Sequence, residues 1–299
     1  MTGLGNLIKR NCRLFFKDKG MFFTSLITPI ILLVLYATFL ANVYKSSFMS
    51  ALPEGFVDAE NIIDKTVAGQ LFSSLLAVCC ITVAFCSNML MVQDKVNGVR
   101  KDLTVTPVKR SVLALSYYVS TAFSTLIVCF GAAAACFIYI ANIGWYMSAE
   151  DVLMILGDIF LLVMFGTALS SIVNSFLTSQ GQISAVGTVV SAGYGFICGA
   201  YMPISQFGEE LQKVLSFLPG TYGTSLLKNH AMRGVFEEMT DIGFPEEIVE
   251  AIKDSVDCNL YFFDNKVETG DMCLILAIAD VVLIGVYIIL NMLKSDARR

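Results

Sequence analysis

Residues 69–92 read GQLFSSLLAVCCITVAFCSNMLMV, a long apolar run that contains no charged side chain. A helix of about 20 mostly apolar residues crosses the roughly 30 Å hydrocarbon core of a bilayer. Because lipid offers no hydrogen bonds to an exposed backbone, such a run must be a helix whose amides pair internally. Five further runs share this apolar character: residues 21–41, 111–140, 152–177, 183–202 and 272–293. The sequence therefore predicts an all-α polytopic membrane protein with six transmembrane helices.

The composition and the placement of charge support this class. Hydrophobic residues make up 56% of the chain and charged residues 15%, and the mean hydropathy is +0.71. Most of the 20 basic residues lie in segments 9–19, 95–110 and 294–299, on one side of the predicted membrane. Since basic residues accumulate on the cytoplasmic side, both termini are predicted to be cytoplasmic. The net charge of −5 comes mostly from the outer loops, so it does not indicate a nucleic-acid partner.

Residues 1–20 precede the first run and are predicted to form an amphipathic helix. Lys9, Arg10, Arg13 and Lys17 lie on one face at helical spacing, and apolar side chains lie on the opposite face. Such a helix lies in the membrane interface with its cations at the phosphate groups. The alternative is ordinary positive flanking charge without an interfacial helix. The rest of the chain, residues 21–299, is predicted to be one membrane domain.

The segment between the last two runs, about residues 203–270, is predicted to be an outer cap. Pro203 ends the fifth run, and an amphipathic stretch then reaches a second break at Pro219-Gly220, followed by Tyr222. This pattern predicts short re-entrant helices that dip into the outer leaflet.

The cap is also acidic. Its acidic side chains favour a solvated face, with a docking surface for a basic peptide or protein as the alternative; they are Glu237, Glu238, Asp241, Glu246, Glu247, Glu250, Asp254 and Asp257. His230 is the only histidine. A lone histidine forms neither a catalytic triad nor a metal cluster, so no catalytic or metal site is predicted.

The loop between the second and third runs, residues 93–110, reads QDKVNGVRKDLTVTPVKR. Gly98 interrupts it, and Thr106-Pro107 predicts a turn. A loop of this kind can present a short helix to a cytoplasmic partner. The alternative is a simple cationic connector whose long side chains reach toward the interface.

Small residues recur at every fourth position in the fifth run. Gly187, Ser191, Gly195 and Gly199 form one stripe on a helix, and such stripes allow another helix to approach closely. The alternative is the general enrichment of glycine in membrane helices. Pro29 should kink the first transmembrane helix, and we expect the stripe to pack on that helix of a second copy, across a dimer axis.

Two acidic residues, Asp158 and Asp280, lie within predicted transmembrane helices. Because a central aspartate costs about 2.5–3.5 kcal/mol on insertion scales, each is expected to face protein or water. The functional interpretation is a substrate path for a cationic group. The alternative is a protonated or hydrogen-bonded packing residue.

Taken in order, these motifs make the chain resemble the membrane-subunit (permease) family of type-2 ABC exporters. In the inner loop the matching positions are Asp94, Gly98, Thr106, Pro107, Val108 and Arg110, and in the outer segment they are Pro203, Pro219, Thr221, Tyr222 and Gly234. Val96 and Lys101 stand where this family usually has acidic residues. The resemblance extends over the leader helix, the six runs and the long outer segment.

The resemblance implies a permease that forms a homodimer or heterodimer and couples to two copies of a separate ATPase subunit. It implies that the leader helix and the inner loop contact that subunit; the loop residues concerned are Asp94, Gly98, Arg100, Lys101, Thr106, Pro107 and Arg110. The chain has no G-x-x-x-x-G-K-[ST] motif, so ATP and Mg are expected on the partner subunit. The implied activity is export of an amphiphile (a drug, peptide, lipid or lipid-linked glycan) across a bacterial plasma membrane.

Two other functions fit the residues alone. One is a membrane sensor or immunity protein that binds an extracellular ligand through the acidic cap. The other is an ion-coupled transporter that uses Asp158 and Asp280.

Overall fold

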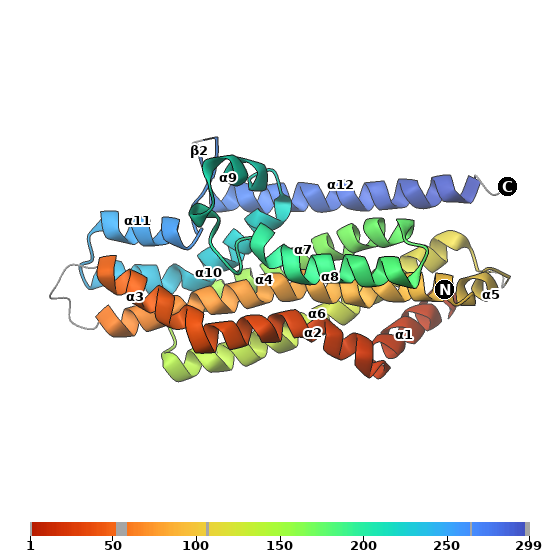
Figure 1. The fold of residues 1–299 in the computed structure, drawn as a ribbon, viewed down its shortest axis with the longest axis horizontal. Coiled ribbons are helices and arrows are strands. Elements are labelled where there is room, and N and C mark those ends of the chain that lie inside the picture. The colour runs from red at the N-terminus through yellow and green to blue at the C-terminus, as the bar shows by residue number, and fades with distance from the viewer. Residues whose placement is uncertain (1, 52–58, 106–107, 264, 297–299) are drawn as a thin grey trace.

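A computed structural model describes residues 2–51, 59–105, 108–263 and 265–296 of the chain. The described residues form an elongated bundle of long helices with one small β-hairpin (Figure 1). The first helix, α1, and the last turns of α12 lie at the same end of the bundle. The side of the membrane on which this end lies stays a prediction.

The N-terminal region consists of one amphipathic helix and one long, interrupted helix. Helix α1 (Thr2–Lys17) ends before Asp18, whose side chain accepts a hydrogen bond from the amide of Met21 and so caps α2 (Lys19–Leu35). The helix continues through a π-helical segment, η1 (Tyr36–Leu40), into α3 (Ala41–Ala51). The α-helical hydrogen-bond pattern therefore changes at η1, beyond Pro29, which lies inside α2.

Helix α4 (Ala59–Val96) is the centre of the bundle. It packs against α2, α6, α7, α8 and α10. It begins well before Gly69, because Ile62, Ile63 and Val67 are buried at helical spacing and extend the apolar face outward. The predicted transmembrane run is therefore confirmed as a helix, with an outer extension that the apolar run did not include.

Five helical stretches are long and apolar enough to cross a membrane: Lys19–Met49, Glu60–Val96, Arg110–Ile143, Ala149–Phe176 and Thr269–Leu293. The last three belong to α6 (Arg110–Ile143), α7 (Ala149–Phe176) and α12 (Thr269–Asp296). The remaining predicted run, 183–202, contains α8 (Gln180–Ile197), which is shorter and begins with two glutamines. Five of the predicted spans are thus supported by length and hydropathy, and the sixth stays a prediction.

The segment after α8 folds back onto the bundle. It contains η2 (Ile204–Gln206), α9 (Glu209–Leu215), α10 (Pro219–Asp241), α11 (Glu246–Ser255), and an antiparallel pair of strands, β1 (Leu260–Phe262) and β2 (Asn265–Val267). Helix α10 packs against α4, α7 and α12, and its first turns are buried. The predicted break at Pro219 is the start of this helix. The depth of α9 and α10 in the membrane stays a prediction.

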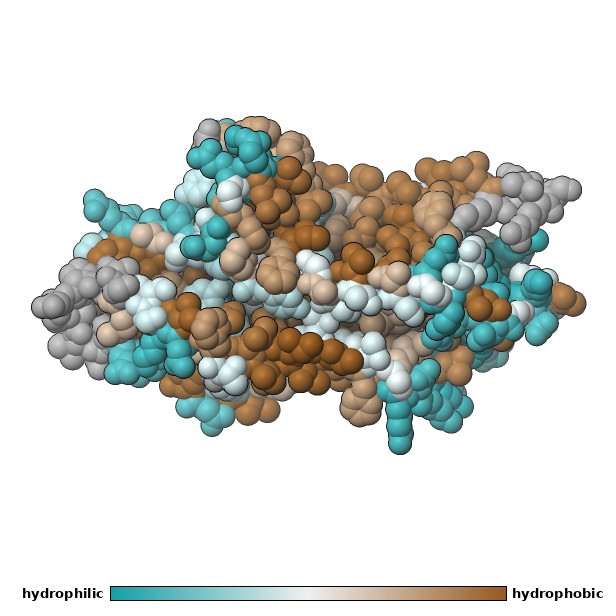
Figure 2. All heavy atoms as spheres, in the orientation of Figure 1, coloured by the Kyte–Doolittle hydropathy of each residue, from teal (hydrophilic) through white to brown (hydrophobic). Residues whose placement is uncertain are grey.

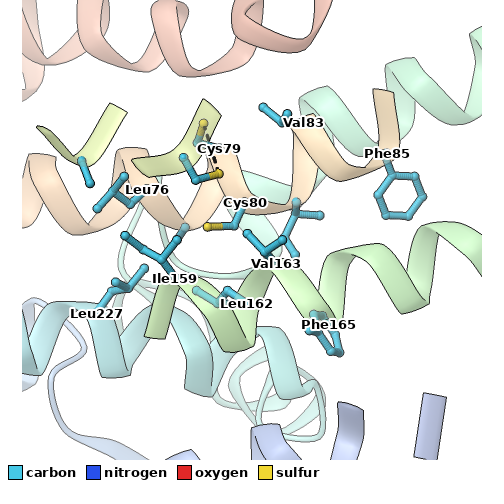
Figure 3. Close-up of a cluster of buried hydrophobic side chains, with 14 of the residues drawn as sticks. Leu76, Cys79, Cys80, Val83, Phe85, Ile159, Leu162, Val163, Phe165 and Leu227 are labelled. Atoms are coloured by element: carbon cyan, nitrogen blue, oxygen red, sulfur yellow. Dashed lines mark hydrogen bonds between the residues drawn. The ribbon is translucent and has the colours of Figure 1, made fainter. Parts of the chain in front are cut away.

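The core lies between α4, α7 and α10. Leu76, Cys79 and Cys80 of α4 face Ile159, Leu162 and Val163 of α7, and Leu227 of α10 closes the cluster (Figure 3). All nine cysteines are free thiols. Exposed apolar side chains cover α2, α6 and α12. Figure 2 shows them as brown surface between two hydrophilic ends, the pattern of a surface that faces lipid.

Candidate functional site: a groove between the first long helix and α8

A groove of about 1210 Å³ runs between the α2–α3 helix and α8. These two segments lie side by side on the face that Figures 1 and 2 show. Cys86, Met89 and Gln93 of α4 form part of its floor. The groove extends from Asp18, next to α1, to the segment Tyr201–Pro203 after α8. It is therefore a long channel-like surface parallel to the bundle.

The chemistry of the lining changes along the groove. The end near α1 combines aliphatic and hydroxyl side chains without an aromatic ring; they are Met21, Thr24, Ile27, Thr28, Ile31, Ile183, Ser184 and Thr188. The end near the cap is aromatic, with Phe39, Tyr44, Phe48, Phe196 and Tyr201. Asp18 is the one charged side chain among the described lining residues. Such a surface suits an apolar or amphiphilic molecule better than an ion.

The small-residue stripe of α8 has two different environments. A side chain at Gly187 would meet Met89 of α4, and Ser191 lines the groove. At Gly195 the ring of Tyr201 already covers the backbone, and Gly199 ends the helical segment with φ +72°. The predicted docking of one helix along all four positions is therefore wrong at Gly195 and Gly199, because residues of the same chain occupy that space. Close packing at Gly187 and Ser191 stays a prediction.

A buried ion pair, which we call the outer anchor, holds the cap end of the groove. The ammonium group of Lys228 donates to the backbone carbonyl of Gly199 at 2.9 Å and to Asp257 at 3.2 Å. Asp257 also accepts the backbone amides of Ile204 and Ser205 at 2.7 and 3.1 Å. The Lys228 side chain is 0% exposed and that of Asp257 4%. The outer anchor thus joins α10, the end of α11 and the segment that closes the groove.

Most acidic residues of the cap are exposed or half-buried, in line with the predicted solvated face, and Asp257 is the exception. Asp257 is buried in the outer anchor, with a left-handed φ of +59°. Glu250 accepts hydrogen bonds from Lys253 and Lys266, which lower its pKa to about 2. Sequence reasoning missed Lys228. Its signal was a single lysine among the small and apolar residues at the start of α10, which a buried partner must neutralise.

The two intramembrane aspartates lie away from the groove. Asp158 of α7 contacts the Nδ1 atom of His230 on α10 at 2.6 Å. Asp280 is 6% exposed on α12, and its oxygens have no hydrogen-bond partner among the described residues. Both are buried within the bundle, and neither is among the residues that line the groove. The lone His230 is a partner for Asp158 that sequence reasoning did not foresee.

A second ion pair, the inner anchor, holds α1 at the other end of the bundle. The guanidinium of Arg10 donates to both oxygens of Asp94 at 2.7 and 3.0 Å, and the Tyr117 hydroxyl donates to the same carboxylate at 2.5 Å. The hydrogen bond to Asp94 raises the pKa of Arg10. Asp94 is therefore not free to contact a cytoplasmic partner directly; it fixes α1 to α4 and α6.

The inner loop begins directly beyond this anchor. Gly98 ends α4 with φ +81°, and α5 (Val99–Val105) follows. Lys101 and Arg110 are exposed and Arg100 is half-buried, whereas Thr106 and Pro107 lie outside the described residues. On α1, Leu7 and Phe15 pack into the protein and Lys9, Arg13 and Lys17 are exposed. Part of the apolar face of α1 is thus used for packing on α6 rather than on lipid.

The comparisons with known proteins agree with this architecture. The profile of the ABC-2 type transporter family matches residues 2–229, which include α1, the groove and the first half of α10. The chain belongs to the ABC-2 type transporter family and is a membrane-embedded, permease-type subunit of a transporter. No curated protein matches the chain.

Proposed function

We propose that this chain is the permease subunit of an ATP-driven exporter and that the groove between α2–α3 and α8 is its half of the substrate path. The observation that supports the proposal most strongly is the groove itself. It runs along the bundle and has an apolar and hydroxyl-rich lining with a single charged residue, Asp18. An amphiphile can follow such a surface without losing the contacts that a bilayer provides.

The groove also supports a dimer. It is formed by one side of the bundle and is bounded by only two helical segments and the floor of α4. A second copy, of this chain or of a related one, placed against that side would enclose the path. Its closest approach would be near Ser191, a small side chain that lines the groove, because Met89 of α4 already packs against Gly187.

The inner anchor supports coupling to a separate ATPase subunit. Arg10 and Asp94 join α1 to α4 just before the Gly98 turn and α5. A displacement of α5 or α1 would therefore move α4, whose inner end forms part of the floor of the groove. The proposed exporter consists of two permease subunits in a bacterial plasma membrane and two ATPase subunits that bind ATP and Mg.

The rival functions have less support from the geometry. An ion-coupled path through Asp158 and Asp280 would need these residues at the groove, and they do not line it. A ligand-binding acidic cap would have to rely on exposed carboxylates such as Asp241, Glu246 and Glu247, because Glu250 is paired with lysines and Asp257 is buried.

Copurification with an ATPase subunit, followed by ATP-turnover measurements in proteoliposomes, tests the proposal. We expect amphiphiles to stimulate turnover by the wild-type complex, and D94N to lose most of that stimulation while still inserting into the membrane. The control is K213Q in α9, since Lys213 is exposed and lies in the outer cap, away from α1 and the inner loop. Absence of an associated ATPase, or equal stimulation of wild type and D94N, would contradict it.

A further inference from the structure

Three phenylalanine side chains meet on the surface of the cap, where the β-hairpin contacts the end of α9. The rings of Phe262 and Phe263 lie 4.9 Å apart between centroids, and Phe217 lies 5.3 and 5.9 Å from them. All three pairs meet edge to face, an arrangement that aromatic rings prefer. Yet Phe217 is 62% exposed, Phe262 37% and Phe263 53%. The described residues thus assemble this phenylalanine cluster but do not cover it.

Helix α9 extends the apolar surface beyond the three rings. Leu211 and Val214 are exposed and lie one turn apart on α9. By helical spacing, Glu209 and Lys213 lie on the opposite side of this helix. Scattered exposed apolar residues are normal, but a contiguous apolar patch with a polar rim marks a binding surface. None of these apolar residues lines the groove, so the patch is separate from the proposed substrate path.

The patch is continuous with a surface that faces lipid. Strand β2 ends at Val267, and α12 begins two residues later. The first turns of α12 already expose Leu274 and Ile278. Figure 1 shows α9 and β2 next to these turns, and Figure 2 shows hydrophobic surface where that region meets α12. Lipid that covers the exposed face of α12 therefore also reaches the phenylalanine cluster.

The backbone at Phe263 provides a second observation. Its φ is +46°, in the left-handed region that is unfavourable for a bulky side chain. In this conformation the ring still contacts Phe217 and Phe262. A strained residue whose side chain remains largely exposed contributes little to the core, and such strain is found most often at functional positions. The strain therefore favours a role for this ring in binding.

The charges around the cluster indicate which lipids fit it. Its two neighbouring lysines are paired with glutamates, Lys213 with Glu210 at 3.6 Å and Lys266 with Glu250 at 3.0 Å. Glu268, between the hairpin and α12, is exposed and adds negative charge. Anionic headgroups attract basic segments, and this surface is not basic. Binding through aromatic rings at the interface instead suits zwitterionic headgroups.

We propose that the phenylalanine cluster, with Leu211 and Val214, inserts at the boundary between headgroups and acyl chains in the leaflet that borders the cap, and so anchors the cap to zwitterionic lipid. The rings would occupy the depth at which aromatic side chains gather in membrane proteins. Strand β1 begins three residues after Asp257 of the outer anchor. A hairpin seated in lipid therefore holds the outer anchor, and with it the cap end of the groove, at the membrane surface.

Tryptophan fluorescence of the full chain in phosphatidylcholine liposomes tests the anchor. All variants carry W145F, because Trp145 is the single tryptophan of the chain. F262W places an indole in the cluster. Y261W is the matched control, since neighbouring side chains of a strand point to opposite faces and the Tyr261 hydroxyl bonds to Asp254. Phosphatidylcholine brominated near the ester end of its chains should quench F262W several times more than Y261W, and F262W should emit at the shorter wavelength.

F217W introduces the probe from the other element of the cluster and should be quenched as strongly as F262W. Equal, weak quenching of F262W, F217W and Y261W would show that the cluster lies in water and would overturn the proposal. Short-wavelength emission from F262W without quenching would overturn it too, because a protein surface, such as a second copy of the chain, would then cover the cluster. Replacing most of the phosphatidylcholine by phosphatidylglycerol should not increase quenching; a salt-sensitive increase would contradict the preference for zwitterionic lipid.

Discussion

The two anchors use the same chemistry at opposite ends of the groove but differ in burial. The inner anchor pairs Arg10, whose side chain is 29% exposed, with Asp94 and Tyr117. The outer anchor pairs Lys228 with Asp257, and neither side chain is more than 4% exposed. Breaking a fully buried pair leaves a charge without solvent, whereas a partly exposed pair can exchange its partner for water. The comparison therefore indicates a fixed outer end and a releasable inner end, where a coupled ATPase would act.

The largest expected effect is at the outer anchor. K228M should lower the free energy of unfolding by about 3–5 kcal/mol, because it leaves Asp257 buried and unpaired. The double variant K228M/D257N removes both charges and should recover much of that loss, since asparagine tolerates the left-handed backbone at this position. Thermal and denaturant unfolding in detergent measure both variants. Equal instability of the single and the double variant would show that the pair is not the source of the effect.

The next largest effect concerns two glycines, Gly199 after α8 and Gly98 after α4. Gly199 has φ +72°, and a Cβ atom there would lie 2.7 Å from a carboxylate oxygen of Asp257. Gly98 has φ +81°, but a Cβ atom would meet nothing within 4 Å. G98A should therefore cost about 1 kcal/mol through backbone strain alone, and G199A roughly 2–3 kcal/mol, since it also displaces the outer anchor. The same unfolding experiment checks the order; a larger cost for G98A would contradict the contrast.

The smallest effect concerns the exposed network beside the outer anchor. The pKa of Glu250 is lowered from 4.5 to about 2 by Lys253 and Lys266. A depressed carboxylate pKa stabilises the fold above the unfolded-state value, and this contribution is lost as the pH falls from about 4.5 toward 2. E250Q should therefore show a shallower loss of stability over that range, by at most about 1 kcal/mol, because the pair is partly exposed. Unfolding of wild type and E250Q should be measured in parallel over this pH range. Identical pH dependence of the two proteins would contradict the prediction.

The apolar helices could be predicted from the sequence because their signal is local. The run 69–92 identified α4, although its outer extension depends on Ile62, Ile63 and Val67, which stand near charged residues in the sequence and pack in one core cluster with residues of α3 and α10. Helix α1 was predicted from the separation of its basic and apolar faces. The fifth run is the span with the weakest support, since α8 is shorter than the other five stretches and begins within a polar segment.

The anchors could be predicted only in part because their partners are distant along the chain. The sequence of the inner loop points to Asp94 as a functional residue. It does not indicate that Asp94 pairs with Arg10, because the two residues are 84 positions apart. Lys228 and Asp257 are 29 positions apart, and their pairing depends on the left-handed turn at Asp257, which propensity does not specify. Thr106 and Pro107, chosen for the inner loop, lie outside the described residues, so their role stays a prediction.

The central claim is that the substrate passes along the groove between α2–α3 and α8, and a bulky residue placed in that groove tests it most directly. Ser191 lines the groove in the middle of α8, whereas Val189, on the same helix, is 69% exposed and is not one of the residues that line it. ATP-driven movement of a fluorescent amphiphile should be measured in proteoliposomes that contain the chain and its ATPase subunit. The account predicts that S191W abolishes transport and V189W retains it, with similar insertion and ATPase assembly for both variants; equal transport by S191W and V189W would contradict the account.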